Sequence, residues 1–408
     1  INSILPAILK AVSMSLESRA EELLRNNRRH HAGHQYTVPS PDIYPYQWLW
    51  DSCFHAISLS YFDPIAARAE VRSLLAMQYE DGMLPHMFFW KKSMTKPYFL
   101  AWENKKRSSI TQPPMLAYAI WEIHRKHPED QFLEEIYEPT LNYYRYLIEH
   151  RDLRDHHLVS IINPDESGED NSPRFDAAMG APSNISFYRH MYERNKLVEK
   201  NRVCDFNAEI CMRQNFWVKD VPFNVMLIRN LQALGHIASY LGHKQGEHFA
   251  TMHAKLMREA MREHMFEDGV YWSVMGPKHE KIKVATWAHF VPMFASLYTQ
   301  AEAEAVVRDH FRNDLTFRSR FGIRSVSMKE ESYRSDGFWR GPIWLSPQWF
   351  IYKGLRAYGF KEEAVFVKSA MYNNVDSSNF REYFNPETGE GLGAKHFTWG
   401  TLILDMKD

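Results

Sequence analysis

Residues 222–242 read PFNVMLIRNLQALGHIASYLG, and residues 245–265 read QGEHFATMHAKLMREAMREHM. Apolar residues recur in both stretches every three or four positions, a spacing that is typical of an amphipathic helix. Gly242 lies between them, where a helix commonly ends. Gly235 falls inside the first stretch and weakens its intrinsic preference for a helix. The two stretches together predict a helical hairpin.

The same periodicity continues outward along almost the whole chain. Runs that resemble strands are short, such as Gly269–Val274, and favour small hairpins over a large sheet. Alternating helices and strands are absent, so a doubly wound or TIM-type architecture is not expected. The pattern predicts an all-α fold: a single domain over residues 1–408, with paired helices, long loops on one face and an irregular insertion at about 150–220. The other predicted helices cover residues 4–26, 53–61, 64–78, 113–126, 131–149, 289–297, 299–311, 343–358 and 361–372.

Charge and hydrophobicity exclude several classes of partner. The net charge of -1 provides no basic field to hold nucleic acid and no polybasic anchor for a membrane. No apolar run approaches the roughly 18 to 20 residues of a transmembrane helix. The first residues lack a basic region followed by an apolar core, so we expect no leader peptide in the given sequence.

The cysteines and histidines indicate neither a disulfide framework nor a metal site. The three cysteines, Cys53, Cys204 and Cys211, form an odd count that fits a reducing compartment, so thiols and a cytoplasmic location are expected. The spacing of Cys204 and Cys211 does not match a zinc site. A cluster of histidines at residues 30–34 lacks the ligands that would complete a metal site. We therefore expect no metal and no cofactor.

Two acidic segments are candidates for catalysis. Asp165–Phe175 carries four carboxylates within six residues, surrounded by turn formers, which predicts a rigid turn. Asp170 is the candidate general acid, with Glu166 and Glu169 as rivals; a solvated loop or a calcium site is the alternative, although the spacing does not match an EF-hand. Far away in the sequence, Glu382 is the candidate general base, whereas Glu387 lies in a turn and is expected to be exposed.

Aromatic residues accompany both acids, and the chain has twelve tryptophans. The stretch Tyr44–His55 combines rings that can stack on a sugar with Asp51, which can accept hydrogen bonds from two hydroxyls. Tyr333–Trp344 provides a second aromatic loop before a predicted helix. Gln112 precedes two prolines and would be held with little freedom. Helix starts and caps explain each motif equally well when it is taken alone. Acid, base and aromatic surfaces together are what glycoside hydrolysis requires.

Taken in order, these motifs resemble glycoside hydrolase family 63, and within it the shorter bacterial enzymes that act on mannosylglycerate and glucosylglycerate. The matching segments are Gln47–Asp51, Thr111–Pro114, Glu166–Arg174, Trp339–Trp344, Glu382–Tyr383, Pro386–Gly389 and Phe397–Gly400. The resemblance implies an (α/α)6 toroid of six helical hairpins and an inverting α-glycosidase with a small carbohydrate substrate. Two positions depart from the family pattern: Glu169, where an apolar residue is more common, and the Thr398–Gly400 segment, where serine is common.

The resemblance also implies roles for individual residues. Asp170 would be the general acid and Glu382 the general base. The substrate-binding residues would be Tyr44, Trp48, Trp50, Asp51, Gln112, Trp339, Arg340, Gly341 and Trp399. Arg213, Arg334 and Lys219 are the candidates for holding the carboxylate of glycerate.

Other functions remain open from the sequence. An α-glucosidase on disaccharides or oligosaccharides would use the same acids. A sugar epimerase on a similar toroid would need histidines as acid and base, and His55, His86 and His396 are available. A non-catalytic sugar-binding protein could keep the aromatic residues alone. A phosphorylase would replace the base by phosphate, and the presence of Glu382 argues against it.

Overall fold

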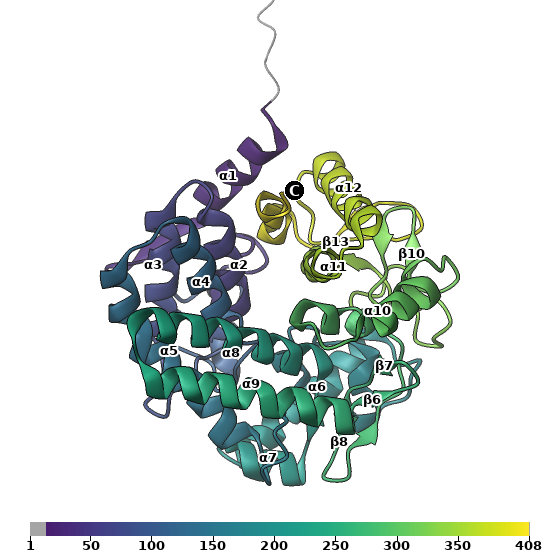
Figure 1. Cartoon of the computed structure of the whole chain (residues 1–408), viewed down its shortest axis with the longest axis horizontal. Coiled ribbons are helices and arrows are strands. Elements are labelled where there is room, and N and C mark those ends of the chain that lie inside the picture. Colours follow the sequence, from purple (N-terminus) through teal and green to yellow (C-terminus); the bar gives the residue numbers. More distant parts are fainter. Residues whose placement is uncertain (1–13, 408) are drawn as a thin grey trace, which may run out of the picture.

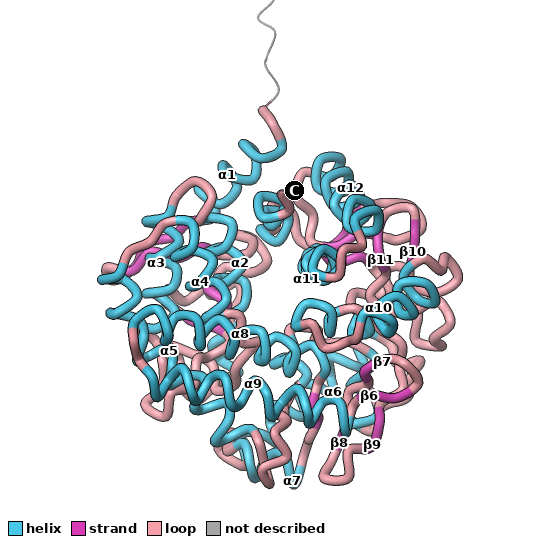
Figure 2. Tube along the Cα trace, in the orientation of Figure 1, coloured by secondary structure: helices cyan, strands magenta, loops and turns pink. Residues whose placement is uncertain are grey.

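The computed structural model describes residues 14–407, and helices dominate that part of the chain (Figure 2). The α-helices are α1 (Leu16–Asn27), α2 (Leu49–Leu59), α3 (Pro64–Leu75), α4 (Leu116–Lys126), α5 (Asp130–Arg151), α6 (Phe187–Val203), α7 (Ala208–Gln214), α8 (Val221–Leu241), α9 (Lys244–His264), α10 (Gln300–Val306), α11 (Leu345–Ala357) and α12 (Lys361–Ser378). Three shorter helical segments matter for the fold: the 3-10 helices η6 (Val291–Ala295) and η8 (Thr398–Asp405), and the π-helical turn η7 (Val307–Phe311). The predicted helix-rich fold is confirmed.

The hairpin predicted at residues 222–265 is formed by α8 and α9. Asp220 caps α8 by accepting a hydrogen bond from the Phe223 amide, and Gly242, with a φ of 79°, ends it. Gly235 is helical, and a Cβ atom built on it would lie 3.7 Å from the Cβ of Ala250 on α9. Gly235 therefore lies where α8 packs against α9, at an ordinary van der Waals distance that would also admit a methyl group.

The helices and short helical segments form a closed ring around the centre of the molecule (Figure 1). The inner elements of this ring are α2, α4, α8, η6, α11 and η8; each contacts the next, and η8 returns to contact α2. Outside this ring, α3 packs on α2, α9 on α8, α12 on α11 and α1 on η8. Buried side chains from all inner elements join one hydrophobic core.

Strands are only two to four residues long, and all their pairings are antiparallel. Three of them, β3 (Gln47–Trp48), β5 (Val218–Lys219) and β12 (Ile343–Trp344), come immediately before the inner helices α2, α8 and α11. They pair with β4 (Met87–Phe88), β8 (Val274–Met275) and β13 (Tyr383–Phe384). The loops at the N-terminal ends of these inner helices are therefore fixed by backbone hydrogen bonds. The remaining strands are β1 (Arg28–His31), β2 (His34–Thr37), β6 (Phe266–Glu267), β7 (Val270–Tyr271), β9 (Glu280–Lys281), β10 (Arg318–Ser319), β11 (Gly322–Ile323) and β14 (Gly391–Leu392).

Several predicted boundaries were wrong. The segment 150–220, expected to be irregular, contains α6 and α7. The stretch 289–297 forms 3-10 turns, including η6, which ends at its C-cap Ser296, where φ is 54°. Of the predicted helix 4–26, residues 4–13 lie outside the described residues, and α1 accounts for the rest. None of the described helices is long and apolar enough to cross a bilayer.

The expectation that Cys204 and Cys211 are thiols was also wrong, because the structure joins them in a disulfide. Cys204 ends α6, and the next two residues, Asp205 and Phe206, both have positive φ values, of 50° and 53°. This reversal directs α7 back toward the end of α6 and brings the two cysteine Cα atoms to 6.2 Å. Spacing in the sequence could not show such a turn. Cys53 is a buried free thiol.

Candidate active site

A cavity of about 710 Å³ lies at the N-terminal ends of the inner helices. Trp50 and Asp51, in the first turn of α2, reach the cavity. So does Trp344, the residue directly before α11. The structure brings together nine of the residues predicted from the sequence, which all line this cavity: Tyr44, Trp48, Trp50, Asp51, Gln112, Asp170, Trp339, Glu382 and Trp399. Segments separated by more than 300 residues in the sequence therefore form one site.

In the acidic loop, Glu166 is turned away from the cavity and fully buried. Its carboxylate accepts two hydrogen bonds from Arg151, at 2.8 and 2.7 Å. It also accepts the backbone amides of Thr111, at 3.1 Å, and Ile162, at 2.7 Å. With four donors on its two oxygens, Glu166 holds the loop in place and is not free to act as an acid.

Glu169 is held in the same way on the other side of the loop. Arg174 donates to its two carboxylate oxygens at 3.0 and 2.8 Å, and Trp287 donates to one of them at 2.8 Å. Arg174 also pairs with Asp220, the capping residue of α8, at 3.1 Å. Burial raises the pKa of Glu169, and its ion pair with Arg174 opposes that shift. Both rivals of Asp170 for the role of general acid are therefore fixed outside the cavity.

Glycine is required where this loop passes the aromatic wall. Gly168 has a φ of 72°, and a Cβ atom built on it would collide with the Trp50 ring. The loop can therefore lie directly on Trp50, with Asp170 two residues further on. Asn171 fixes the opposite side, because its side-chain oxygen accepts the Trp339 amide at 2.9 Å.

Asp170 faces the cavity and pairs with Arg194 of α6. Arg194 also pairs with Asp165, at 2.9 Å. Burial and the nearby charges of Asp170 and Glu166 raise the pKa of Asp165 to about 6, against the opposing effect of Arg194. Arg194 is the one lysine or arginine that lines the cavity within residues 14–407. It places a positive charge beside the candidate acid.

Glu382 lies just before β13 and is also buried at the cavity. It accepts the Tyr44 hydroxyl at 2.7 Å and the Ala394 amide at 2.7 Å. Burial, together with the charges of Asp170 and Asp51, raises the pKa of Glu382 to about 7. The two hydrogen bonds oppose this shift because they stabilise the ionised form. Glu382 can therefore accept a proton above about pH 7.

Aromatic rings and hydrogen-bonding groups complete the wall. Asp51 accepts the Trp399 indole N–H at 2.7 Å, and burial raises the pKa of Asp51 to about 6. Trp339 stacks on Trp344, with ring centres 4.0 Å apart and an angle of 3° between the planes. The Gln112 side-chain oxygen accepts the Trp50 amide at 3.4 Å. Flat aromatic faces beside carboxylates suit the apolar faces and the hydroxyls of a sugar.

Two buried indole groups at the cavity have no acceptor within the described chain. The Nε1 atoms of Trp48 and Trp102 make no hydrogen bond with residues 14–407, and both residues line the cavity. A ligand oxygen could satisfy both donors. His86 lies edge-on to both rings, and burial lowers its pKa to about 3, so it is neutral at physiological pH. The other histidines considered for epimerase chemistry, His55 and His396, do not line the cavity.

Two residues predicted to bind substrate lie outside the cavity lining, which corrects the prediction. Arg340 is buried and donates to both oxygens of Asp176, at 2.9 and 2.6 Å, so its charge is used within the protein. At Gly341 a Cβ atom would collide with the Arg334 carbonyl oxygen, so the glycine permits a tight backbone turn. From the motif Tyr333–Trp344, which contains both, Phe338, Trp339 and Trp344 reach the cavity.

The sequence analysis missed the helix α6, which contributes Phe187, Met191, Arg194, Asn195, Val198 and Glu199 to the cavity. Residues 187, 191, 195 and 198 follow helical spacing, which could have revealed it. The three candidates for the substrate carboxylate lie elsewhere. Arg213 pairs with Glu209 on α7, Arg334 donates to backbone carbonyls at 331 and 333, and Lys219 donates to the Gly276 carbonyl.

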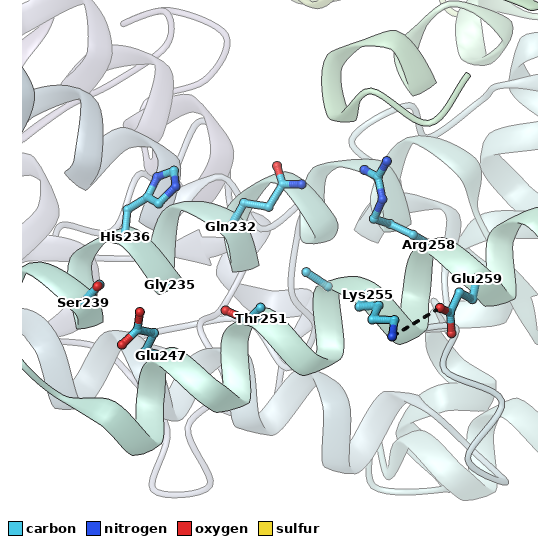
Figure 3. Close-up of a pocket in the computed structure, with 10 residues that line it drawn as sticks. Gln232, Gly235, His236, Ser239, Glu247, Thr251, Lys255, Arg258 and Glu259 are labelled. Carbon is cyan, nitrogen blue, oxygen red and sulfur yellow. Dashed lines mark ion pairs between the residues drawn. The ribbon is translucent and has the colours of Figure 1, made fainter. Parts of the chain in front are cut away.

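A second cavity, of about 530 Å³, lies between α8 and α9 (Figure 3). Its lining holds the ion pair Lys255–Glu259 and no tryptophan, tyrosine or phenylalanine. It therefore lacks the flat surfaces that a sugar site uses. Within residues 14–407, no group of three or more histidines, cysteines and acids is arranged to hold a metal ion.

Comparisons with known proteins identify the family of this chain and several relatives. The family model described as the mannosylglycerate hydrolase MGH1-like glycoside hydrolase domain matches residues 44–400. A mannosylglycerate hydrolase of Thermus thermophilus is 31% identical, covering 94% of this chain and 98% of its own. A glucosylglycerate hydrolase of Mycolicibacterium hassiacum is 26% identical, covering 96% and 97%. A crystal structure of the GH63 mannosylglycerate hydrolase from Thermus thermophilus, in complex with Tris and D-glycerate, has a TM-score of 0.87 at 29% identity, covering 96% of this chain and 99% of that chain.

Proposed function

Because the chain belongs to the MGH1-like glycoside hydrolase domain family, within glycoside hydrolase family 63, we propose that it hydrolyses a small α-linked glycosylglycerate. The sugar is glucose or mannose. Both are represented among the relatives, whose names are mannosylglycerate hydrolase and glucosylglycerate hydrolase. The observation that carries this proposal is that Asp170, Glu382 and Arg194 line one aromatic cavity.

We infer that the ring of helices is an (α/α)6 toroid that forms a single domain. Six inner elements in a closed cycle, with helices packed outside them, support this inference. The short strands before α2, α8 and α11 then hold the loops of the catalytic face. This arrangement explains how loops far apart in the sequence meet at one cavity.

In the proposed mechanism, the reaction is a single displacement that inverts the anomeric centre. Asp170 protonates the glycosidic oxygen as the bond from C1 to that oxygen breaks. Glu382 removes a proton from the water that attacks C1 from the opposite face. Asp51 and the Trp50, Trp339 and Trp399 rings hold the sugar. The histidines do not support epimerase chemistry, which would need one as acid and one as base, because His86 is the one histidine among the described residues that lines the cavity.

Arg194 supports an anionic aglycone. It is the cation of the cavity wall, and its Nε atom is buried without an acceptor among the described residues. A guanidinium matches a carboxylate through paired N–H donors. The unpaired Trp48 and Trp102 indoles provide further donors for the oxygens of a glycerate.

Proton NMR of the first-formed sugar anomer tests the reaction. The enzyme is incubated with α-mannosylglycerate, α-glucosylglycerate and neutral α-disaccharides, with and without phosphate. We expect the β-anomer from a glycosylglycerate. The α-anomer, a sugar phosphate or an epimerised sugar would each contradict the proposal.

Variants of the two acids test their roles. Asp170→Asn and Glu382→Gln remove a proton donor and a proton acceptor, so each is expected to lower kcat by about 10² to 10⁴-fold. Substrate binding should remain measurable by calorimetry. Glu387→Gln is the matched control, because Glu387 is exposed and lies five residues after the base; its kcat should be unchanged. Near-normal turnover in either acid variant would exclude the role assigned to that residue.

The cytoplasmic location remains a prediction. It was based on the cysteine count, whereas the Cys204–Cys211 disulfide is more typical of an oxidising compartment. Thiol trapping followed by mass spectrometry, on protein taken directly from cells, would show whether this pair is reduced where the enzyme works.

A further inference from the structure

Arg194 occupies an unusual position for a residue beside a general acid. Its guanidinium pairs with Asp170 and, at 2.9 Å, with Asp165. Its side chain is 16% exposed, and that of Asp170 is 27% exposed. A nearby positive charge favours the ionised form of a carboxylate. A general acid must instead carry a proton when the substrate is bound. In the ligand-free arrangement, the guanidinium of Arg194 therefore contacts the same carboxylate that must donate the proton.

Apart from Arg194, the titratable groups around Asp170 are acidic. The other titratable groups that face it are Asp165 in its own loop, Glu382 before β13, and Tyr44. Two of these are carboxylates, and like charges close together disfavour ionisation. The Tyr44 hydroxyl donates a hydrogen bond to Glu382 and is therefore not free to donate to Asp170. Among the described residues that line the cavity, Arg194 is thus the one lysine or arginine beside Asp170.

We propose that Arg194 couples the charge of the aglycone to the protonation of the general acid. The carboxylate of the substrate takes the guanidinium away from Asp170, and Asp170 then takes up a proton and becomes competent to donate it. This inference rests on the proposed function, because it requires a substrate with an anionic aglycone. It makes Arg194 a specificity-determining residue: a neutral aglycone leaves Asp170 paired and ionised.

The proposed catalytic cycle takes up and releases equal numbers of protons. Binding of the substrate carboxylate to Arg194 lets Asp170 gain one proton from solvent. Asp170 gives this proton to the glycosidic oxygen as the bond from C1 to oxygen breaks, and Glu382 takes one proton from the attacking water. When glycerate leaves, Arg194 returns to Asp170, and Glu382 releases its proton to solvent. The net reaction consumes one water and no protons.

Binding of D-glycerate to the wild-type protein tests the coupling without measuring activity. Calorimetric titration in buffers of different ionisation enthalpy reports the protons taken up on binding. We expect an uptake approaching one proton per glycerate near pH 7, and none in Asp170→Asn, which should still bind. Binding without uptake, or uptake that persists in Asp170→Asn, overturns the coupling while leaving an anionic substrate possible. Absence of binding overturns the proposed substrate and the coupling with it.

Kinetics with charged and neutral aglycones test the specificity. For Arg194→Gln we expect kcat/KM on the glycosylglycerate to fall at least ~10-fold, because a paired charge is lost. The kcat on the matching glycosylglycerol, which lacks the carboxylate, should rise about tenfold near neutral pH, because Asp170 has lost its cation. Arg194→Lys should restore part of the preference for the charged aglycone.

The matched control is Arg189→Gln, on the same helix, where the arginine is exposed and pairs with Glu193. It changes the net charge equally and should leave both substrates unaffected. If Arg194→Gln lowers kcat on the neutral substrate or leaves it unchanged, Arg194 is a binding or structural residue and the coupling is wrong. The titration of the wild-type protein decides the question even if the Arg194 variants fold poorly.

Discussion

At the scale of single residues, this site assigns different tasks to carboxylates through their neighbours. Glu166 and Glu169 are bound by Arg151 and Arg174 and serve as anchors. Glu382 is held by a phenol and a backbone amide, which leave it able to exchange a proton. The side chain is a glutamate in each case. The partner and the burial of each carboxylate determine whether it supports the loop or does chemistry.

The pH dependence of the reaction follows from Glu382. The base must be ionised, and its pKa is about 7, so kcat/KM should fall as the pH decreases through that value. The Tyr44 hydrogen bond stabilises the ionised form and lowers this pKa. Tyr44→Phe should therefore move the acidic limb of the kcat/KM profile upward by about one pH unit.

Tyr98→Phe is the control for this shift. Tyr98 also lines the cavity, but its hydroxyl donates to the Ile43 carbonyl and makes no hydrogen bond with Glu382. Its acidic limb should match that of the wild type. An unchanged limb in Tyr44→Phe would mean that another group controls the profile.

At the scale of elements, the acidic loop is a rigid unit fixed at both sides. Arg151 at the end of α5 holds one side, and the pair Arg174 and Asp220 connects the other side to the start of α8. Asn171 binds the backbone at Trp339 and so joins this loop to the one before α11. Asp170 is therefore positioned by α5, by the start of α8 and by the loop before α11. Its loop behaves as part of the core.

Removing Arg174, the cation that pairs with Glu169 and Asp220, tests this rigidity. Arg174→Ala leaves the buried carboxylates of Glu169 and Asp220 without a counter-charge, so we expect a loss of about 3–5 kcal/mol in the free energy of unfolding. Urea denaturation measures it. Arg72→Ala is the matched control: it breaks an exposed pair with Glu135 and should cost about 0–1 kcal/mol. Equal losses of unfolding free energy in the two variants would show that Arg174 does not hold the loop.

At the scale of the whole molecule, the closed ring connects the two ends of the described chain. η8, near the C-terminus, lies between α2 and α11 and also packs against α1. Trp399 in η8 donates to Asp51 in α2, so closing the ring also completes the site. No inner element can leave without exposing the faces of both its neighbours.

Such an arrangement should unfold as one unit. Differential scanning calorimetry is expected to give one endotherm, with the disulfide intact, because every inner element shares one hydrophobic core. D-glycerate at about 100 times its Kd should stabilise the folded state by about 2.7 kcal/mol and move that single peak upward. Two separate peaks, of which only one responds to glycerate, would contradict the single-domain proposal.

The sequence by itself determined the helical hairpin of α8 and α9, the two segments that carry the candidate acids and most of the aromatic wall. These depend on local patterns: apolar spacing within a helix, turn formers around acids, and rings beside carboxylates. Gly168 shows the limit of local reasoning, since its contact with the Trp50 ring depends on how the acidic loop packs against α2.

Only the tertiary structure decided which charges face the cavity. Arg340 forms its ion pair with Asp176, away from the cavity lining. Arg194 lies on α6, a helix that the sequence analysis missed, and pairs with Asp170. The physical reason is that an arginine side chain is long and its pairing energy depends on the acid that folding brings near it. Sequence spacing records neither that partner nor the burial that makes the pairing strong.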